Sequence, residues 1–267
     1  MHFPQYLHAT LIQASQNKQC DLDPIPTSLL KDCVTLLVPT VTKIINLSLS
    51  TGSFPSLFKD SVVKPLLKKP SLDKELLSNY RPISNLSFLS KLLERAVLSH
   101  LNESLTSNNP LNPNQSAYTK HHSTETVLAS LYNKLVMAIG RQQVSCLCLL
   151  DISAAFDTID HSILIKRLSS VFGISGTALL WIKSYLSSRS FTVNAAGYSS
   201  NPHTLTCGVP QGSVLGPLLF ILYTSTLSKH ISSFSVGRSS PLRWQYTTVH
   251  VFLPSLPSRR TKSHACT

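Results

Sequence analysis

The chain has 267 residues, enough for one large domain or two small ones, each with an ample hydrophobic core. Lysine and arginine together number 24 against 12 acidic residues, which gives a formal net charge of +12. This excess favours a polyanionic partner, and nucleic acid is favoured over a membrane surface. The alternative is that the chain is basic by chance and that its charge has no binding function.

The sequence contains no visible membrane span or secretory signal. The longest apolar run, Val214 to Tyr223, is far shorter than the ~20 residues that cross a bilayer, and the first residues (MHFP) lack the basic start and apolar core of a signal peptide. The six cysteines include no Cys-x-x-Cys pair. We therefore expect an intracellular protein in a reducing compartment, not secreted and with no membrane partner.

The N-terminal part predicts helices after a turn. Two prolines within residues 21–26 exclude a regular helix there. A first helix is expected from Thr27 or Ser28 to about Val38, and a second over residues 39–50, with Gly52 as its stop. We expect residues 1–54 to form a helical N-terminal extension.

A basic strand and a long helix follow. Residues 61–67 are typical of a strand, and Lys64, Lys68 and Lys69 lie on or just after it. These lysines indicate either a solvated edge or an edge that faces phosphates. The helix begins near Ser84 or Asn85, and its apolar positions recur at helical spacing on one buried face: Leu86, Leu89, Leu92, Leu93, Ala96, Val97, Leu101 and Leu105.

The central feature of the chain is a strand that ends on an acid. The apolar run Cys146–Leu150 predicts a strand buried on both faces, and Asp151 follows it directly. A carboxylate there is costly unless it is paired, protonated or bound to a metal. The simpler interpretation is that Asp151 caps the next turn and Asp157 caps a helix from about Ile159.

The string that starts at Asp151 (DISAAFDTIDH) resembles the first catalytic motif of reverse transcriptases, and is closest to those of retrotransposons without long terminal repeats. The resemblance implies that Asp151 is catalytic and that it binds Mg²⁺ or Mn²⁺ together with the carbonyl of Ile152. It also implies that Phe156 rejects a ribose 2′-hydroxyl, where the alternative is a core aromatic.

Two segments resemble the finger motifs of these enzymes. In the first (NYRPIS), the resemblance implies that Arg81 faces nucleotide or template phosphates. The second, residues 115–124 (QSAYTKHHST), departs from the usual pattern QxGFRxxxST, because Ala117 replaces glycine and Thr119 replaces arginine. Threonine cannot grip a triphosphate as an arginine fork does. The adjacent Lys120 is a point charge on the opposite side of an extended chain, and it remains the candidate for nucleotide binding here.

The glycines and prolines of residues 208–217 (GVPQGSVLGP) predict a loop whose backbone comes close to a neighbouring group. The simpler interpretation is a tight turn packed on a neighbouring sheet. The string resembles the second palm motif, which lies along the template–primer beneath the incoming nucleotide. The resemblance implies nucleotide contacts from Gln211 and Gly212, and nucleic-acid contacts from Gly208 and Pro210.

The four motifs occur in the order of the family and cover about residues 55–230. The fold that they imply is α+β: the fingers and palm of a right-hand polymerase, with a small antiparallel palm sheet backed by helices. We expect this domain over residues 55–235, with an incomplete palm and no thumb. The intervening patterns predict helices over 124–139, 163–172, 175–187 and 218–227, and short strands over 191–193 and 204–207. Ser123 or Thr124 is expected to cap the first of these helices.

The family takes its other catalytic carboxylates from a Tyr-Ala-Asp-Asp hairpin, and here no acidic residue follows Thr226. Read one base later, codons for Leu242–Tyr246 can spell Tyr-Ala-Gly-(Asn or Ser)-Thr. We therefore hypothesise a frameshift between about Val236 and Leu242, with residues 236–267 as an out-of-frame, disordered tail.

The resemblance implies RNA-directed DNA polymerisation for a retrotransposon, with an RNA template, a DNA primer and deoxynucleoside triphosphates as partners. Target-primed copying in related elements implies the nucleus. Because one catalytic carboxylate motif is absent, we expect this chain to be inactive. Two alternatives are a basic nucleic-acid-binding remnant and an unrelated interaction domain.

Overall fold

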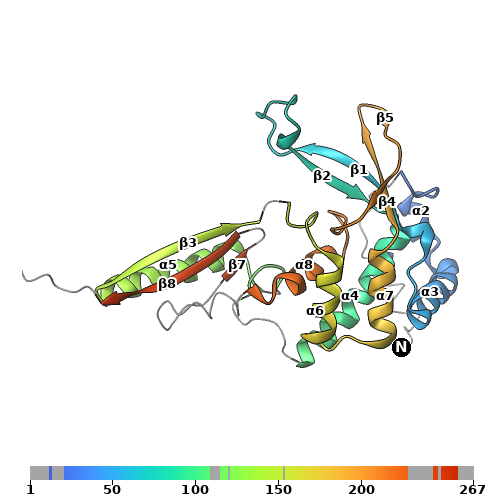
Figure 1. Cartoon of the computed structure of the whole chain (residues 1–267). Coiled ribbons are helices and arrows are strands. Elements are labelled where there is room, and N and C mark those ends of the chain that lie inside the picture. Colours follow the sequence, from blue (N-terminus) through green and yellow to red (C-terminus); the bar gives the residue numbers. More distant parts are fainter. Residues whose placement is uncertain are drawn as a thin grey trace, which may run out of the picture. The chain divides into compact units, whose positions relative to one another are not determined.

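The computed structural model describes residues 12–13, 21–108, 115–119, 121–152, 154–227, 243–245 and 248–257. The chain divides into two compact units: unit one holds residues 1–110 and 156–223, and unit two holds residues 111–155 and 224–267. Their elements are labelled in Figure 1. The boundaries predicted after residues 54 and 235 fall inside units one and two respectively, and the predicted domain division stays a prediction.

Unit one begins with α2 (Thr27–Asp32) and α3 (Val34–Thr51). The predicted break at Pro39 is wrong, because the helix changes direction at Cys33 and runs through the proline. Gly52 ends α3 in the left-handed conformation, as predicted. By length and composition α3 could cross a membrane, a test that core helices of soluble proteins also pass. The hydroxyl of Ser48 on α3 accepts a 2.9 Å hydrogen bond from the indole N–H of the buried Trp181. The face of α3 that carries Ser48 therefore packs inside unit one.

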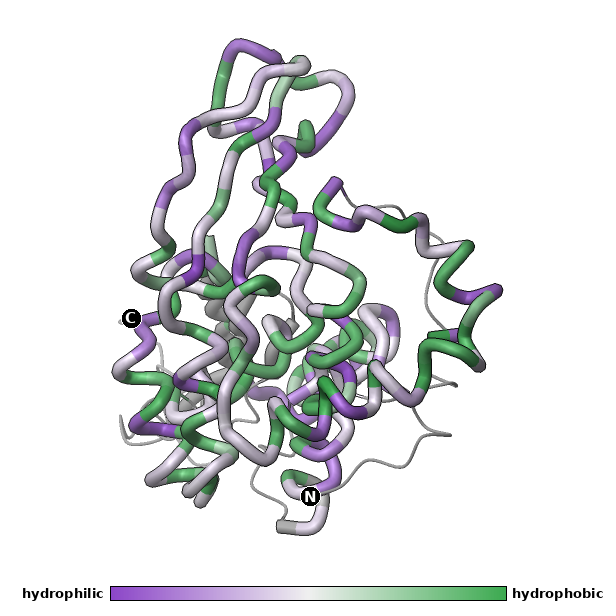
Figure 2. Tube along the Cα trace, turned by 90° about the vertical axis from the view of Figure 1, so that its right-hand side faces the viewer, coloured by the Kyte–Doolittle hydropathy of each residue, from purple (hydrophilic) through white to green (hydrophobic). Residues whose placement is uncertain are grey.

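The sheet of unit one combines strands that are distant in sequence. Its order is β2-β1-β4-β5, with β6 also paired to β4. β1 and β4 are parallel, while the other pairs are antiparallel. The extended ribbons project at the top in both views, and hydrophilic stretches alternate with hydrophobic ones along them (Figure 2). The strands are β1 (Asp60–Leu67), β2 (Tyr80–Asn85), β4 (Arg189–Ala195), β5 (Tyr198–Ser199) and β6 (His203–Leu205). Two short 3-10 helices, η1 (Ser56–Phe58) and η2 (Leu77–Asn79), precede β1 and β2.

Four more helices complete unit one: α4 (Phe88–Asn108), α6 (His161–Ser170), α7 (Gly176–Leu186) and α8 (Gly216–Thr224). The predicted apolar stripe of α4 is confirmed, since seven of its eight residues are buried: Leu86, Leu92, Leu93, Ala96, Val97, Leu101 and Leu105. An aromatic cluster of Phe54, Trp181 and Tyr185 lies beside it, with Trp181 and Tyr185 stacked at 5.6 Å.

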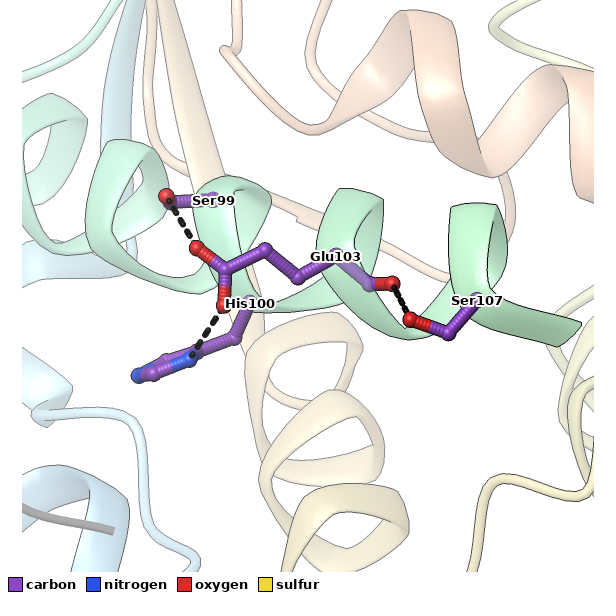
Figure 3. Close-up of polar contacts among 4 residues, drawn as sticks. All are labelled: Ser99, His100, Glu103 and Ser107. Carbon is purple, nitrogen blue, oxygen red and sulfur yellow. Dashed lines mark hydrogen bonds and ion pairs between the residues drawn. The ribbon is translucent and has the colours of Figure 1, made fainter.

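The two ends of α4 are stabilised differently. Its start is capped from outside, because both carboxylate oxygens of Asp23 accept hydrogen bonds of 3.0 Å from the Phe88 amide. The predicted cap at Ser84 or Asn85 is therefore wrong, since β2 extends through both residues. Toward the other end, Glu103 lies near Ser99 and pairs with His100 at 3.8 Å, and its carbonyl accepts from Ser107 (Figure 3). Such exposed pairs contribute little to stability.

Unit two contains α5 (Thr124–Gly140) and a sheet of three antiparallel strands in the order β3-β8-β7. The bounds are β3 (Gln143–Asp151), β7 (Arg243–Gln245) and β8 (Thr248–Pro257). The predicted cap of α5 is confirmed, as Ser123 forms a capping box with Thr126. On the expected strand β3, Leu147 is 40% exposed, so burial on both faces is wrong at that position. Strands β7 and β8 lie in the segment predicted as a disordered tail.

Candidate nucleic-acid interface

The glycine loop, residues 208–215, is attached to the turn before α6. The Gly208 amide donates to the Ile159 carbonyl at 2.7 Å, and the Val209 amide donates to the Phe156 carbonyl at 2.8 Å. His161 Nε2 lies 2.7 Å from the Gly208 carbonyl. Because a carbonyl only accepts, this ring nitrogen carries the proton and donates it.

Glycine at position 208 is required by this close approach. Its φ is +80°, and a Cβ there would lie 2.7 Å from the Phe156 carbonyl oxygen and 2.8 Å from the Asp157 Cα. The conformation and the space both exclude a side chain. At this end the loop therefore packs on the turn before α6, and not on the neighbouring sheet of the simpler interpretation.

The middle of the loop is attached to β2. The Ser84 amide donates to the Gln211 carbonyl at 2.7 Å, and a Cβ at Gly212 would lie 2.7 Å from the Ser84 carbonyl oxygen. Strand β2 carries Arg81, which is exposed and pairs in register with Leu66 of β1. The structure thus brings the first finger motif and the glycine loop together within unit one.

The end of the loop is held by a buried carboxyl group. Glu94 of α4 is 0% exposed, and its Oε2 accepts from the amides of Val214 at 2.7 Å and Leu215 at 3.0 Å. Burial raises the pKa of Glu94, while these amides and the charge of Arg189 lower it. Sequence reasoning missed Glu94, although an acid on the apolar face of α4 is itself an indication of a buried polar role.

The loop residues differ in their accessibility to a ligand. Gly208 and Pro210 are buried, so the backbone of this part offers little surface for nucleic-acid contact. Gln211 is half-buried, and Gly212 is exposed. Phe156 is half-buried with its ring 5.7 Å from that of Phe220, which fits the core alternative for this side chain. Its predicted role as a sugar gate stays a prediction.

Two of the three candidate lysines of the β1–β2 ribbon already have a polar partner in the structure. Lys64 Nζ pairs with Asp21 at 2.6 Å, with both side chains about half exposed, and Lys68 Nζ donates to the Ser78 carbonyl at 2.7 Å. Lys69 is exposed near the tip of the ribbon. An exposed ion pair is weak and exchangeable, so Lys64 can still turn to a phosphate.

The acids after Phe156 have structural positions. Asp160, not Asp157, caps α6, accepting from the Ile163 amide at 2.8 Å, so the predicted cap at Asp157 is wrong. The helix starts at His161, between the two starts that the sequence suggested, about Ile159 and residue 163. Desolvation raises the pKa of Asp157 above its ordinary value.

Asp151 lies in unit two, as the last residue of β3. It pairs in register with Thr248 of β8, and Thr248 pairs with Gln245 of β7. Asp151 is the sole acid in the three described strands of this sheet. Ile152 follows it, half-buried. Lys120 lies outside the described residues, and so does the side chain of Asp151.

A centre with two metal ions needs carboxylates from neighbouring strands. The strands beside Asp151 supply a threonine and a glutamine at the paired positions, so this donor set does not fit such a centre. Within the described ranges, no three or more histidine, cysteine or acidic residues group as metal ligands.

Comparison with known proteins identifies the family. The sequence model of "Reverse transcriptase (RNA-dependent DNA polymerase)" matches residues 67–252, most of the chain. The chain belongs to the reverse transcriptase family. It is 32% identical over 210 residues to the probable RNA-directed DNA polymerase from transposon BS of Drosophila melanogaster, covering 79% of this chain and 23% of that protein.

Other relatives point to the same kind of element. The RNA-directed DNA polymerase from mobile element jockey of Drosophila funebris is 33% identical, over 69% of this chain and 20% of that protein. The reverse transcriptase domain is therefore of the kind found in retrotransposons without long terminal repeats, as predicted. The chain spans less than a quarter of the length of these relatives.

Solved structures confirm the predicted α+β fold of reverse transcriptase fingers and palm. Apo telomerase from Candida tropicalis, truncated from its C-terminal domain, has a TM-score of 0.53 at 13% identity, over 86% of this chain and 49% of that one. Telomerase from Candida albicans, in complex with a fragment of telomeric RNA, has a TM-score of 0.54 at 13% identity, over 90% and 45%.

Proposed function

We propose that this chain is a reverse transcriptase domain that binds RNA or an RNA–DNA hybrid but does not catalyse polymerisation. The observation that carries the proposal is the strand pairing around Asp151, where β8 and β7 offer Thr248 and Gln245 in place of a second carboxylate. Without metal-held charge stabilisation, nucleotidyl transfer loses its largest catalytic contribution, several kcal/mol or more.

Binding is supported by the basic ribbon and the glycine loop of unit one. Lys69, Arg81 and Gly212 are exposed, and the loop is fixed at Ser84 to β2, the strand that carries Arg81. The ligand classes that fit unit one are an RNA template and a DNA primer, read through their phosphates, and deoxynucleoside triphosphates at Arg81 and Gln211. The nucleotide-binding role of Lys120, which belongs to unit two, stays a prediction. Asp151 and the Ile152 carbonyl would hold at most one Mg²⁺ or Mn²⁺, which is too few for the two-metal reaction.

Primer extension by the purified chain tests the inactive half of the proposal. We expect no templated extension with Mg²⁺ or with Mn²⁺ on an RNA template with a DNA primer. The control is Asp151→Ala, which should be indistinguishable from the parent. Robust extension that disappears in Asp151→Ala would overturn the inactive reading.

Salt dependence of RNA binding tests the other half. The triple substitution of Lys64, Lys68 and Lys69 by alanine should lower the slope of log affinity against log salt by up to about 2, at roughly 0.7 for each phosphate neutralised on a single strand. The matched control replaces Lys43, Lys166 and Lys183, which are exposed on α3, α6 and α7 and carry the same charge. An equal loss of slope in both triples would assign the binding to net charge alone.

We further propose that the chain acts inside the cell, in the nucleus or the cytoplasm, and that it carries the frameshift predicted between about Val236 and Leu242. The family model matches the chain in the present reading frame as far as residue 252, an observation that counts against the frameshift. Sequencing of the encoding DNA tests the frameshift: codons that cannot spell Tyr-Ala-Gly-(Asn or Ser)-Thr one base later rule it out.

A further inference from the structure

A single buried side chain, Glu94, connects α4 to the end of the glycine loop. Its Oε2 accepts the two backbone hydrogen bonds from Val214 and Leu215 and a third from the Tyr185 hydroxyl at 3.3 Å. Its Oε1 accepts from Ser90 at 3.3 Å, one turn earlier on the same helix. The carboxyl group is completely buried, so these contacts replace its hydration.

A buried cation accompanies this carboxyl group. Arg189 of β4 is 1% exposed and its Nη1 donates to the Tyr185 carbonyl at 2.9 Å, while its guanidinium lies 4.7 Å from the centre of the Tyr185 ring. Its charge favours the ionised form of Glu94. Nε and Nη2 of Arg189 have no hydrogen-bond partner within the described part of the chain. The loop end is therefore attached to a charged, dehydrated core and not to solvent.

The two amides that donate to Glu94 belong to Val214 and Leu215, the last two residues before α8 begins at Gly216. A buried backbone amide outside a helix or sheet needs an acceptor from elsewhere in the chain. The next amide, of Gly216, is satisfied by the Ser213 hydroxyl at 3.1 Å. Glu94 thus completes the set of contacts that fix the loop, together with His161 at Gly208 and Ser84 at Gln211.

We propose that Glu94 is a positioning residue: its carboxyl group holds residues 208–215 in the conformation that presents Gln211 and Gly212 to nucleic acid. Because Glu94 is completely buried, it acts through the loop and not by contact with the nucleic acid. The part of this inference that concerns nucleic acid rests on the proposed function, whereas the part that concerns the loop stands on the contacts alone.

The informative pair of variants is Glu94→Met and Glu94→Gln. Methionine keeps the approximate length and volume but offers no strong acceptor, so the two amides lose their partner. Glutamine can place its carbonyl oxygen where Oε2 lies, while its amide nitrogen donates to Ser90. The matched control is Glu103→Met on the same helix, where the Glu103 side chain is 72% exposed.

Hydrogen exchange of residues 208–215 is the first measurement. In Glu94→Met we expect the Val214 and Leu215 amides to exchange at least about tenfold faster than in the parent, because each amide loses its buried acceptor. The exchange rates of the α7 amides should change little. Glu94→Gln and Glu103→Met should stay close to the parent. Unchanged exchange in Glu94→Met, or equal acceleration in Glu94→Gln, would overturn the positioning role.

RNA affinity at fixed salt is the second measurement. We expect Glu94→Met to weaken binding about tenfold and Glu94→Gln to restore it, because a loosened loop must be ordered again on binding. If the parent protein binds no RNA, the proposed function fails, and exchange alone decides the role of Glu94. If Glu94→Met does not fold, Glu94→Asp replaces it: the shorter side chain draws the carboxylate away from the amides and should accelerate their exchange. Exchange at the parent rate in Glu94→Asp would then overturn the proposal.

Discussion

Gly208→Ala is expected to destabilise unit one strongly, and a second glycine provides the matched reference. Gly208 and Gly197 have nearly equal φ angles, +80° and +83°. A Cβ at Gly197 would meet nothing within 4 Å, whereas at Gly208 it would lie 2.7–2.8 Å from three backbone atoms of Phe156 and Asp157. Both variants adopt a conformation that costs an L-residue about 1–2 kcal/mol, and only Gly208→Ala adds an overpacking cost of about 1–3 kcal/mol.

Urea denaturation followed by tryptophan fluorescence measures this difference. The chain has two tryptophans, so a Trp244→Phe background leaves Trp181, which is buried in unit one, as the reporter. With a slope of about 1–3 kcal/mol per molar urea, the midpoint of Gly208→Ala should lie about 1 M below that of Gly197→Ala. Equal midpoints would refute the argument that the backbone at Phe156 and Asp157 excludes a side chain at position 208.

Three further substitutions have expected effects on stability. Asp23→Ala should cost about 0.5–2 kcal/mol, because the Phe88 amide loses its cap, and the same urea titration measures the loss. Ser48→Ala should cost about 1–3 kcal/mol of unfolding free energy, because the buried indole N–H of Trp181 loses its acceptor. The control is Ser50→Ala, which removes an exposed hydroxyl on the same helix. A similar loss of stability in Ser50→Ala would contradict the role assigned to Ser48. Burial raises the pKa of Glu94, so the folded protein holds this proton more tightly than the unfolded chain, and stability should fall as pH rises from about 4.3 toward the raised pKa. Glu94→Gln should lack this fall, and identical profiles of unfolding free energy against pH would contradict the raised pKa.

Local patterns predicted the local structure well. The cap of α5 at Ser123, the stop of α3 at Gly52 and the apolar face of α4 depend on neighbours within one or two turns, and all three are confirmed. The cap of α4 is different, because Asp23 reaches Phe88 across 65 residues of chain. Propensity and periodicity carry no information about such a contact, and the nearest serine or asparagine was the only available candidate.

The glycine loop illustrates the same limit at the candidate site. Its glycines indicated a close approach of backbone, and the resemblance to a palm motif suggested nucleic acid as the partner. At Gly208 and Gly212 the approaching groups are the carbonyls of Phe156 and Ser84, on the chain itself. The string NYRPIS was likewise expected as a lead into a helix and is the edge strand β2. Strand pairing of this kind is decided by the partner strand, which a single sequence segment does not identify.

The parallel pairing of β1 with β4 affects how the protein can be made. Asp60 lies beside Ser190, 130 residues later, so at about 5–20 residues per second a ribosome needs roughly 6–26 s between them. During that time β1 and β2 can form their hairpin, but the other side of β1, with Val62 and Val63, has no partner strand. An unpaired apolar edge recruits other chains. We expect nascent chains that end before about residue 195 to bind chaperones or to aggregate, and chains released after about residue 227 to resist proteolysis in unit one.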